Sequence, residues 1–338
     1  MAGKESLKGN CVKTYLRRFP DTPTLTIARK IYKENLELFT SLESARKTVR
    51  YYRGQTGDDG RAKVSTKEFL RPITNNTNPF RLPESFASVR QDYILPKSAT
   101  NILMLSDIHV PYQNNEAITL CLNLGKEKNI NTIYLNSDII DMYQASFHEK
   151  DPRNRSIKDE LEMTRELLAS IRNAFPKAYI YYKEGNHSAR LRRYLMVKAP
   201  ELLDCTEFEL PTLLRFNEFK IHWIPNKQAV KIGKLYVLHG NEFKGGGGTS
   251  PARAYYTKSK VSIIAGDKHQ TSEHTEPSLD GSTITCWSTG CLCELNPDYM
   301  PFNKWNLGAA LINVEEDGDF SVHNFRIVKG KNGKLKIV

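Results

Sequence analysis

Side chains that can bind metals occur at five places in this sequence, each just after a short apolar run. They are Asp107 and His109, then Asp138 and Asp141, then Asn186 and His187, then His239, and finally Asp267 and His269. A short continuous apolar run bounded by polar residues predicts a buried strand. Open α/β sheets bind ligands beyond the carboxyl ends of their strands, so we expect these side chains to meet in one site.

The chemistry of this set is that of a metal-dependent phosphoesterase. Two divalent ions about 3.5–4 Å apart can grip a phosphoryl group and supply a hydroxide that attacks it. Such a pair needs one bridging carboxylate together with neutral imidazole and carbonyl ligands. These donors suit manganese, iron or zinc better than calcium. The sequence therefore predicts two divalent metal ions as cofactors, with manganese as the expected metal and iron or zinc as alternatives.

The order of these motifs resembles the calcineurin-like metallophosphoesterase superfamily over about residues 100–330. The motifs are Asp-x-His, Ser-Asp-x-x-Asp, Gly-Asn-His, a single His, and Gly-Asp-x-His. The resemblance implies a β-sandwich flanked by helices, with both metals at one end of the sheets. It implies that the first metal is held by Asp107, His109 and His269, that Asp138 bridges, and that the second metal is held by Asn186, His239 and Asp267. It also implies that His187 is a general acid or transition-state donor oriented by Asp141.

Three positions depart from the family pattern. Ser137 replaces the glycine before the bridging carboxylate, and Ser188 stands where an acidic residue is common. Asp267 replaces the first histidine of the last motif. Because a carboxylate can also ligate, we expect two metals with an altered preference, although Asp267 could instead weaken the second site.

Up to residue 200, short apolar runs that predict strands alternate with segments that have the apolar periodicity of helices. Beyond residue 200, most segments predict strands. We predict helices over 115–128 and from Ser156, and strands over 219–224, 228–238, 260–265, 282–288, 308–314 and near 320–327. Strand–helix alternation is typical of the α/β class. The predicted fold is therefore α/β, a metallophosphoesterase-type sandwich over residues 99–330, with a small all-helical domain ahead of it.

Residues 1–54 predict three short amphipathic helices, and residues 55–98, rich in Gly, Asn and Pro, predict a linker. Residues 1–90 hold 18 Lys and Arg against 9 Asp and Glu, although the whole chain has a net charge of only +11. Arg46, Arg50 and Arg53 recur at helical spacing on the third helix. The module resembles a helix-turn-helix, so these arginines are candidate nucleic-acid contacts. The alternative is a helical appendage with a solvated basic face.

Composition narrows the protein class. The chain has 338 residues, 39% of them hydrophobic, enough for a sizeable core. It has no apolar run of the roughly 18–20 residues that cross a membrane. The start lacks the apolar segment of a signal peptide, so we expect a cytoplasmic protein without a membrane partner. We expect the cysteines to be free thiols; Cys286, Cys291 and Cys293 could hold zinc, but the Cys-x-Cys spacing is unusual and no fourth ligand is evident.

The sequence thus predicts a phosphodiesterase or nuclease acting on nucleic acid, with Arg190 contacting the substrate phosphate. Two alternatives remain open: a phosphomonoesterase acting on phosphoprotein or nucleotide, and a nucleic-acid-binding protein whose catalytic site is weakened at Asp267. The basic helical module and the segment GCLCELNPDYMPFNKWN also resemble bacteriophage-encoded members of the superfamily. That resemblance would place the protein in the host cytoplasm.

Overall fold

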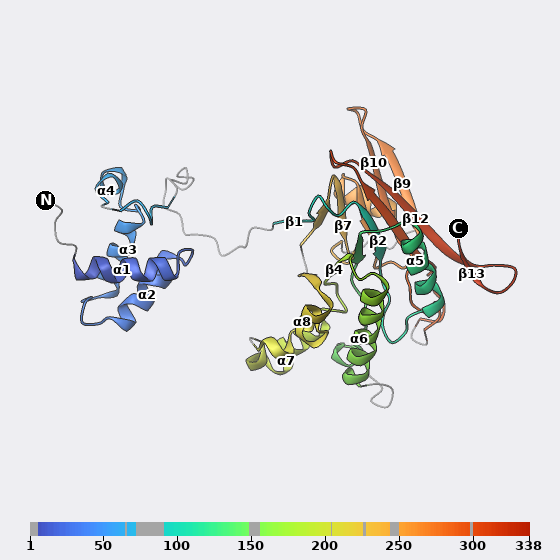
Figure 1. The fold of residues 1–338 in the computed structure, drawn as a ribbon, viewed down its shortest axis with the longest axis horizontal. Helices are drawn as coiled ribbons and strands as arrows, with labels where there is room; N and C mark the ends of the chain where they lie inside the picture. The colour runs from blue at the N-terminus through green and yellow to red at the C-terminus, as the bar shows by residue number, and fades with distance from the viewer. Residues whose placement is uncertain are drawn as a thin grey trace. The chain divides into compact units, whose positions relative to one another are not determined.

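A computed structural model describes most of the chain as two compact units, Met1–Ala87 and Ser88–Val338 (Figure 1). The described residues are 6–64, 66–71, 91–148, 156–203, 205–225, 228–243, 250–297 and 300–338. Within them, no helix is both long enough and apolar enough to span a membrane.

The first unit is a small helical domain. Its helices are α1 (Leu7–Arg18), α2 (Thr24–Glu34), α3 (Leu42–Tyr52) and α4 (Asp58–Ala62). Serine side chains begin two of them, because Ser6 Oγ accepts a hydrogen bond from the Gly9 amide and Ser41 Oγ accepts one from the Ser44 amide. Such caps satisfy amides that a helix start leaves unpaired. The apolar faces enclose a core that includes Val12, Ile31 and Val49.

The helical unit extends past Gly54, where we predicted a linker. Helix α4 follows Gly54, and Val64 is buried in the same core as α1 to α3. Phe69 and Leu70 also pack against that core. The predicted start of the linker, residue 55, is therefore too early in the sequence. The residues just after it still include apolar side chains that pack in the helical core. Residues 72–90 of that linker lie outside the described residues.

Arg53 does not belong to the exposed arginine stripe that the sequence predicted. Its side chain is 1% exposed and donates hydrogen bonds to Thr24 Oγ1 at 3.0 Å and to the Pro20 carbonyl at 3.2 Å. Arg53 is the residue that caps the end of α3, so its side chain turns inward. Burial lowers the pKa of its guanidinium to about 10. Arg46 and Arg50 remain on the surface of α3.

The large unit contains two sheets. The seven-stranded sheet has the order β13-β12-β11-β2-β3-β4-β5 and the six-stranded sheet the order β1-β6-β7-β8-β10-β9. In the first sheet the strands are β2 (Asn101–Leu105), β3 (Thr132–Leu135), β4 (Tyr179–Lys183), β5 (Ile221–Ile224), β11 (Leu307–Val314), β12 (Phe320–Lys329) and β13 (Leu335–Ile337). In the second they are β1 (Tyr93–Ile94), β6 (Val230–Ile232), β7 (Leu235–Leu238), β8 (Ile263–Ala265), β9 (Ser272–Pro277) and β10 (Thr283–Ser288).

Both faces of the central strands are covered, which explains their continuous apolar runs. From β2, Ile102 and Met104 enter a core shared with strands of the other sheet, and Leu103 and Leu105 enter a second core with helices. That second core is built with α5 (Asn115–Glu127) and α6 (Ile157–Ala174), seen together in Figure 1. The remaining helices are α7 (Arg190–Lys198), α8 (Leu210–Leu213), α9 (Phe216–Phe219) and α10 (Pro251–Ser259). The predicted α/β class, two sheets flanked by helices, is confirmed.

The predicted limits of this domain, 99–330, are too narrow. Strand β1 pairs with β6 and strand β13 pairs with β12, so both ends of the sheets lie outside those limits. The predicted strand 228–238 is two antiparallel strands, because Gly233 turns the chain with φ of +56°. Strand β9 escaped prediction because its residues are mostly polar and its burial alternates without a fully buried position.

The topology places the predicted site residues at one end. Strands β2, β3 and β4 pair in parallel in one sheet, and β7 and β8 pair in parallel in the other. Each of these five strands is followed directly by one of the motifs. Because parallel strands end at the same edge, the five loops emerge together.

Candidate metal centre

Three ligand candidates from the first and last motifs lie in direct contact. His269 Nε2 lies 3.3 Å from His109 Nε2 and 3.3 Å from Asp107 Oδ1. All three side chains are buried and offer ligand atoms within 4.8 Å of one another. Two imidazole nitrogens and a carboxylate oxygen that converge on one point make a suitable set for a divalent ion.

A second group gathers around His239. Its Nε2 lies 2.9 Å from Asp138 Oδ2, 3.0 Å from Asn186 Oδ1 and 3.6 Å from Asp267 Oδ1. Asp107, Asp138 and His239 also offer ligand atoms within 4.8 Å of one another, which joins the two groups into one cluster. The structure therefore brings together all seven side chains that the sequence singled out as metal ligands.

Glycines make room for the two central carboxylates. A Cβ at Gly185 would collide with Ser137 Oγ and Asp138 Oδ1, and a Cβ at Gly266 would collide with the Asp107 carboxylate. The motif glycines before Asn186 and Asp267 thus let the loops pass close to the ligands. Ser137 has φ of +71°, a left-handed conformation that glycine adopts more readily than serine.

The loops themselves are bent into an uncommon backbone conformation. The left-handed region is occupied by Asp107 (φ 54°), His109 (51°), Asp138 (47°), Asp267 (63°) and His269 (55°). Each such residue costs on the order of 1–3 kcal/mol, and this strain clusters at functional sites. The packing of the surrounding sheets must therefore stabilise these strained loops. The loops in turn bring the ligand side chains together.

The electrostatics of the cluster fit bound cations. Burial raises the pKa of Asp138, but the neighbouring His239 and His187 lower it further, so it ends well below its usual value. Burial lowers the pKa of His239, yet Asp138 and Asp107 raise it to about 10. Asp107 likewise raises the pKa of His269 to about 10 against the effect of burial, whereas burial lowers the pKa of His109, so in the protein without metal the carboxylates favour protons on His239 and His269. Divalent ions would supply that positive charge directly and leave the imidazoles neutral, as ligands must be.

One carboxylate orients two imidazoles at the rim. Asp141 Oδ1 lies 2.8 Å from His187 Nδ1 and 3.2 Å from His109 Nδ1. His187 is 16% exposed and its Nε2 lies 3.9 Å from Asp138 Oδ2. A carboxylate on the far nitrogen of a ligand histidine fixes its tautomer, so Asp141 serves a ligand as well as His187.

Arg190 is engaged with the same group. Its Nη1 donates to the Asp141 carbonyl at 2.7 Å, and its Nη2 lies 3.1 Å from His187 Nε2. The sequence singled out Arg190 as a contact for substrate phosphate. In the structure its side chain instead holds His187 and Asp141, and a phosphate contact would have to share that guanidinium.

Two supporting residues were missed by the sequence interpretation. Glu242 accepts hydrogen bonds from the amides of His239 at 3.2 Å and Gly240 at 2.7 Å. The fully buried Lys183 lies 3.3 Å from the Glu242 carboxylate. Glu242 stands three residues after His239, but no local pattern marks a buried ion pair whose partner is far away in the sequence.

Asp267, the departure from the family pattern, is a partial ligand candidate. Its Oδ1 faces His239, while its Oδ2 lies 2.6 Å from Lys268 Nζ. One carboxylate oxygen therefore remains for a metal and the other is neutralised by the adjacent lysine.

Comparisons with known proteins give distant structural similarities alone. No protein-family model matches the sequence, and no curated protein is similar to it. The structure is similar to Vps29 from Chaetomium thermophilum, with 14% identity, 71% of this chain and 94% of that chain covered and a TM-score of 0.36. It is similar to a dimetal phosphatase from Danio rerio, with 11% identity, 71% and 98% covered and a TM-score of 0.36. It is also similar to nuclease MPE from Pseudomonas putida, with 11% identity, 66% and 86% covered and a TM-score of 0.32. Similarities this distant assign neither a family nor an activity.

Proposed function

We propose that this protein is a metal-dependent phosphoesterase that hydrolyses phosphodiester bonds in nucleic acid. The observation that supports this most is the convergence of carboxylate, imidazole and amide ligands from five strand ends, with His187 at the rim. A bridging carboxylate between two imidazole-containing groups is the donor set that dinuclear hydrolases need. We propose manganese as the metal, because oxygen and imidazole donors suit it.

The ligands would divide between two ions. Asp107, His109 and His269 would hold the first, Asn186, His239 and Asp267 the second, and Asp138 would lie between them. When bound, such ions supply Lewis-acid activation of the phosphoryl group and of the attacking water.

The remaining steps belong to side chains at the rim. His187 would serve the leaving oxygen from its Nε2, because Asp141 lies 2.8 Å from its Nδ1 and orients the ring. Arg190 places a positive charge 3.1 Å from that Nε2. Because a guanidinium only donates, this contact must open before His187 can serve the leaving oxygen, and the guanidinium would then face the negative charge that develops on the transferred group.

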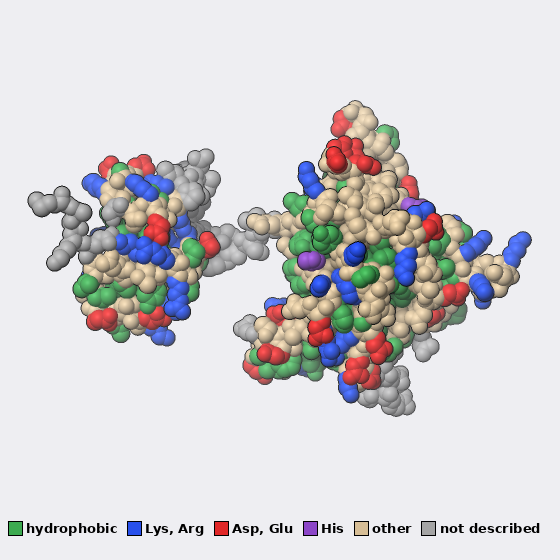
Figure 2. All heavy atoms as spheres, viewed as in Figure 1, with side chains coloured by type: hydrophobic (Ala, Val, Ile, Leu, Met, Phe, Trp, Pro, Cys, Tyr) green, Lys and Arg blue, Asp and Glu red, His purple; other side chains and the backbone are tan. Residues whose placement is uncertain are grey.

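The helical unit supports a nucleic-acid substrate. Residues 1–90 carry twice as many basic as acidic residues, 18 against 9. Arg46 and Arg50 lie on the surface of α3, where Arg46 donates to Glu43 and Arg50 donates to the Gln55 carbonyl in solvent-exposed hydrogen bonds. Figure 2 shows acidic side chains among the basic ones on the displayed face of this unit.

The first experiment compares substrates. The manganese-loaded protein should hydrolyse a chromogenic phosphodiester and single- or double-stranded DNA or RNA faster than a chromogenic phosphomonoester. Faster monoester turnover would reverse the assignment in favour of a phosphomonoesterase. No turnover of any ester with bound metal would reject the enzyme and leave a nucleic-acid-binding protein.

The second experiment separates docking from folding. Replacing Arg46 and Arg50 by alanine should weaken nucleic-acid binding and reduce the slope of log affinity against log salt by about one per lost phosphate contact. Turnover of the small diester should stay unchanged. Arg53→Ala is the contrasting variant, because its buried guanidinium holds Pro20 and Thr24 and its loss should unfold the helical unit. Unchanged nucleic-acid affinity at low salt in the Arg46/Arg50 variant would reject the docking role.

A further inference from the structure

A short segment carrying two cysteines lies against the metal centre. Cys291 pairs with Leu307 through an isolated bridge, and Cys293 pairs with Gln113 through another. Between them the Leu292 amide donates to the Asp107 carbonyl at 3.1 Å. The segment is therefore fixed from both sides, next to a loop that provides a metal ligand.

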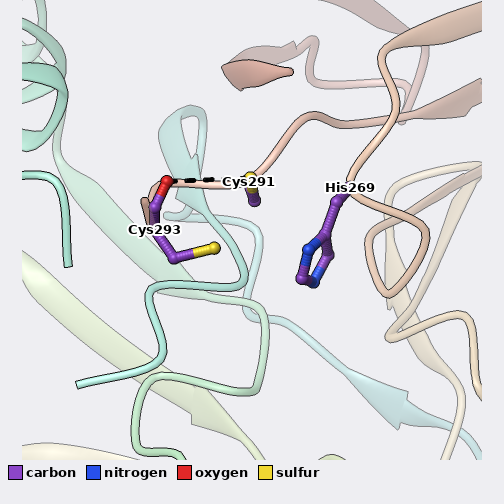
Figure 3. A group of neighbouring side chains, drawn as sticks. All are labelled: His269, Cys291 and Cys293. Carbon is purple, nitrogen blue, oxygen red and sulfur yellow. Dashed lines mark hydrogen bonds between the residues drawn. The ribbon is translucent and has the colours of Figure 1, made fainter. Parts of the chain in front are cut away.

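Both thiols are buried beside His269. Cys291 is 0% exposed, Cys293 is 2% exposed and His269 is 6% exposed. Figure 3 shows the Cys293 sulfur pointing toward the His269 ring. One ligand atom from each of the three residues lies within 4.8 Å of the other two. Cys286, which the sequence grouped with these cysteines, instead donates to the Val261 carbonyl at 3.4 Å.

The imidazole of His269 has one nitrogen left over. Its Nε2 faces Asp107 and His109, but its Nδ1 is buried and has no hydrogen-bond partner among the described residues. A ligand histidine normally donates its second N–H to a carboxylate, a carbonyl or water. Here the groups on that side are thiols, which are weak acceptors.

The thiols themselves are only loosely held by the protein. Cys291 Sγ lies 3.6 Å from the Asn306 carbonyl and 4.0 Å from the Cys293 carbonyl, the latter drawn as the dashed line in Figure 3. The Cys291 and Cys293 sulfurs lie within 4.8 Å of each other, so they are neighbours. Two adjacent sulfurs and the second nitrogen of His269 thus lie together in a buried place, where their hydrogen-bond partners are weak.

Two sulfurs and one imidazole nitrogen form a soft donor set. Thiolates favour zinc, copper(I) and similar ions, whereas the carboxylate and amide donors of the neighbouring centre favour harder ions. A zinc ion takes sulfur at about 2.3 Å and nitrogen at about 2.0–2.1 Å, so its ligands lie roughly 3.5–4 Å apart. The spread of up to 4.8 Å seen here needs only a small contraction.

We propose that His269, Cys291 and Cys293 form a separate site for a thiophilic ion of the zinc class, linked to the candidate dinuclear centre through the His269 imidazole. When the neighbouring centre is loaded through His269 Nε2, binding of the thiophilic ion releases three protons to solvent, one from each thiol and one from His269 Nδ1, and the imidazole bridges the two sites as an imidazolate. The backbone carbonyl of Asn306 or a water can complete the coordination. The proposal does not depend on the reaction proposed above.

Cadmium is the probe, because thiolate–cadmium bonds absorb in the ultraviolet and carboxylate–cadmium bonds do not. Reduced, manganese-loaded full-length protein is titrated with cadmium chloride, and the absorbance should saturate at about one equivalent per chain. Cadmium K-edge absorption spectra of the same samples should show two sulfur neighbours. Manganese released into the filtrate is measured to detect displacement from the neighbouring centre.

Cysteine variants show which thiols produce the ultraviolet absorbance of the thiolate–cadmium bonds. Replacing Cys291 and Cys293 by serine should abolish it. Cys121→Ser should keep it, because Cys121 is a fully buried thiol of the same core cluster and is not among the three. A Cys11→Ser/Cys205→Ser variant should also keep it, because this change removes the two partly exposed thiols.

The outcomes are decisive even if the Cys291/Cys293 variant does not fold. Absence of the thiolate band in the wild-type protein, or a K-edge spectrum with no more than one sulfur neighbour, would overturn the site. A band that survives in a folded Cys291/Cys293 variant, or that disappears in the Cys11/Cys205 variant, would place the cadmium elsewhere and overturn it equally.

Discussion

The buried ion pair of Lys183 and Glu242 ties the two sheets together beneath the metal centre. Lys183 ends β4 of the seven-stranded sheet, and Glu242 follows β7 of the six-stranded sheet. Lys183 Nζ lies 3.3 Å from Glu242 Oε1, and the two side chains are 0% and 12% exposed. We expect Lys183→Met, which keeps the length of the side chain and removes its charge, to destabilise the large unit and to weaken metal binding.

The magnitude follows from burial. Removing one partner of a buried pair costs about 3–5 kcal/mol, because the other charge stays buried without compensation. The stranded Glu242 carboxylate also accepts the amides of His239 and Gly240, so its displacement moves a ligand loop. Loss of such a supporting contact typically lowers metal affinity roughly 10–100-fold.

An exposed pair in the same unit is the matched control. Lys234 Nζ lies 2.6 Å from Asp319 Oδ1, a shorter distance than in the buried pair, but the two side chains are 58% and 63% exposed. Water screens such a pair, so Lys234→Met should leave stability unchanged within error. All three tryptophans of the chain lie beyond residue 200, so their fluorescence in denaturant reports on the large unit alone. Metal affinity is read by competitive titration with a chelator.

A double variant completes the test. Lys183→Met/Glu242→Gln leaves neither charge buried alone, so its loss of stability should be smaller than the sum of the two single losses. The reasoning is refuted if Lys183→Met costs no more than Lys234→Met, or if the two single losses simply add. Either result would mean that the pair contributes no net coupling between the sheets.

Three further outcomes are expected. Asp138→Asn should remove nearly all hydrolysis and lower the bound metal, because this carboxylate lies within 4.8 Å of His109 in the first ligand group and of His239 in the second; near-normal turnover with full metal content would contradict a dinuclear centre. His187→Ala should keep its metals and lose roughly 10²–10⁴ in kcat, less for substrates with good leaving groups, and a collapse of metal content would make it a ligand instead. Burial raises the pKa of Glu242, but Lys183 and the Gly240 amide lower it further, to below 4.5. Ionised Glu242 therefore stabilises the folded protein fully at a pH above the pKa that this side chain has in the unfolded chain. This stabilisation is lost as the pH falls through the lower pKa of Glu242 in the folded protein. The unfolding free energy of metal-free Glu242→Gln should accordingly fall less steeply below pH 4.5 than that of the wild type.

The sequence alone was enough for the fold class and the ligand candidates. An apolar run such as Ile102–Leu105 is long enough only for a strand, and a strand apolar on both faces must be buried on both. Polar ligands that follow several such strands then have to meet, because parallel strands share their carboxyl ends. These inferences need only neighbours in the chain, which is why Asp107, Asp138 and His239 could be grouped before the structure was known.

The limits of the large unit depend on which strands pair with each other. The two-residue strand β1 has no local pattern and exists because Tyr93 and Ile94 pair with β6. Strand β13 likewise exists because it pairs with β12. In the helical unit, periodicity placed Arg53 on a stripe with Arg46 and Arg50, but the end of α3 turns it toward Pro20 and into the core.

Only the tertiary structure decided which charged and polar groups support the site. Lys183 and Glu242, which form the buried ion pair, are 59 positions apart in the sequence. His269, which lies with the thiols of Cys291 and Cys293, belongs to the last ligand motif rather than to the cysteine segment. The second imidazole that Asp141 holds, His109, follows a neighbouring strand of the same sheet, and only the folded structure shows that one carboxylate reaches both rings. Residue type and spacing name the groups that can ligate, whereas burial and long-range packing determine what each one touches and therefore which charge or proton it carries.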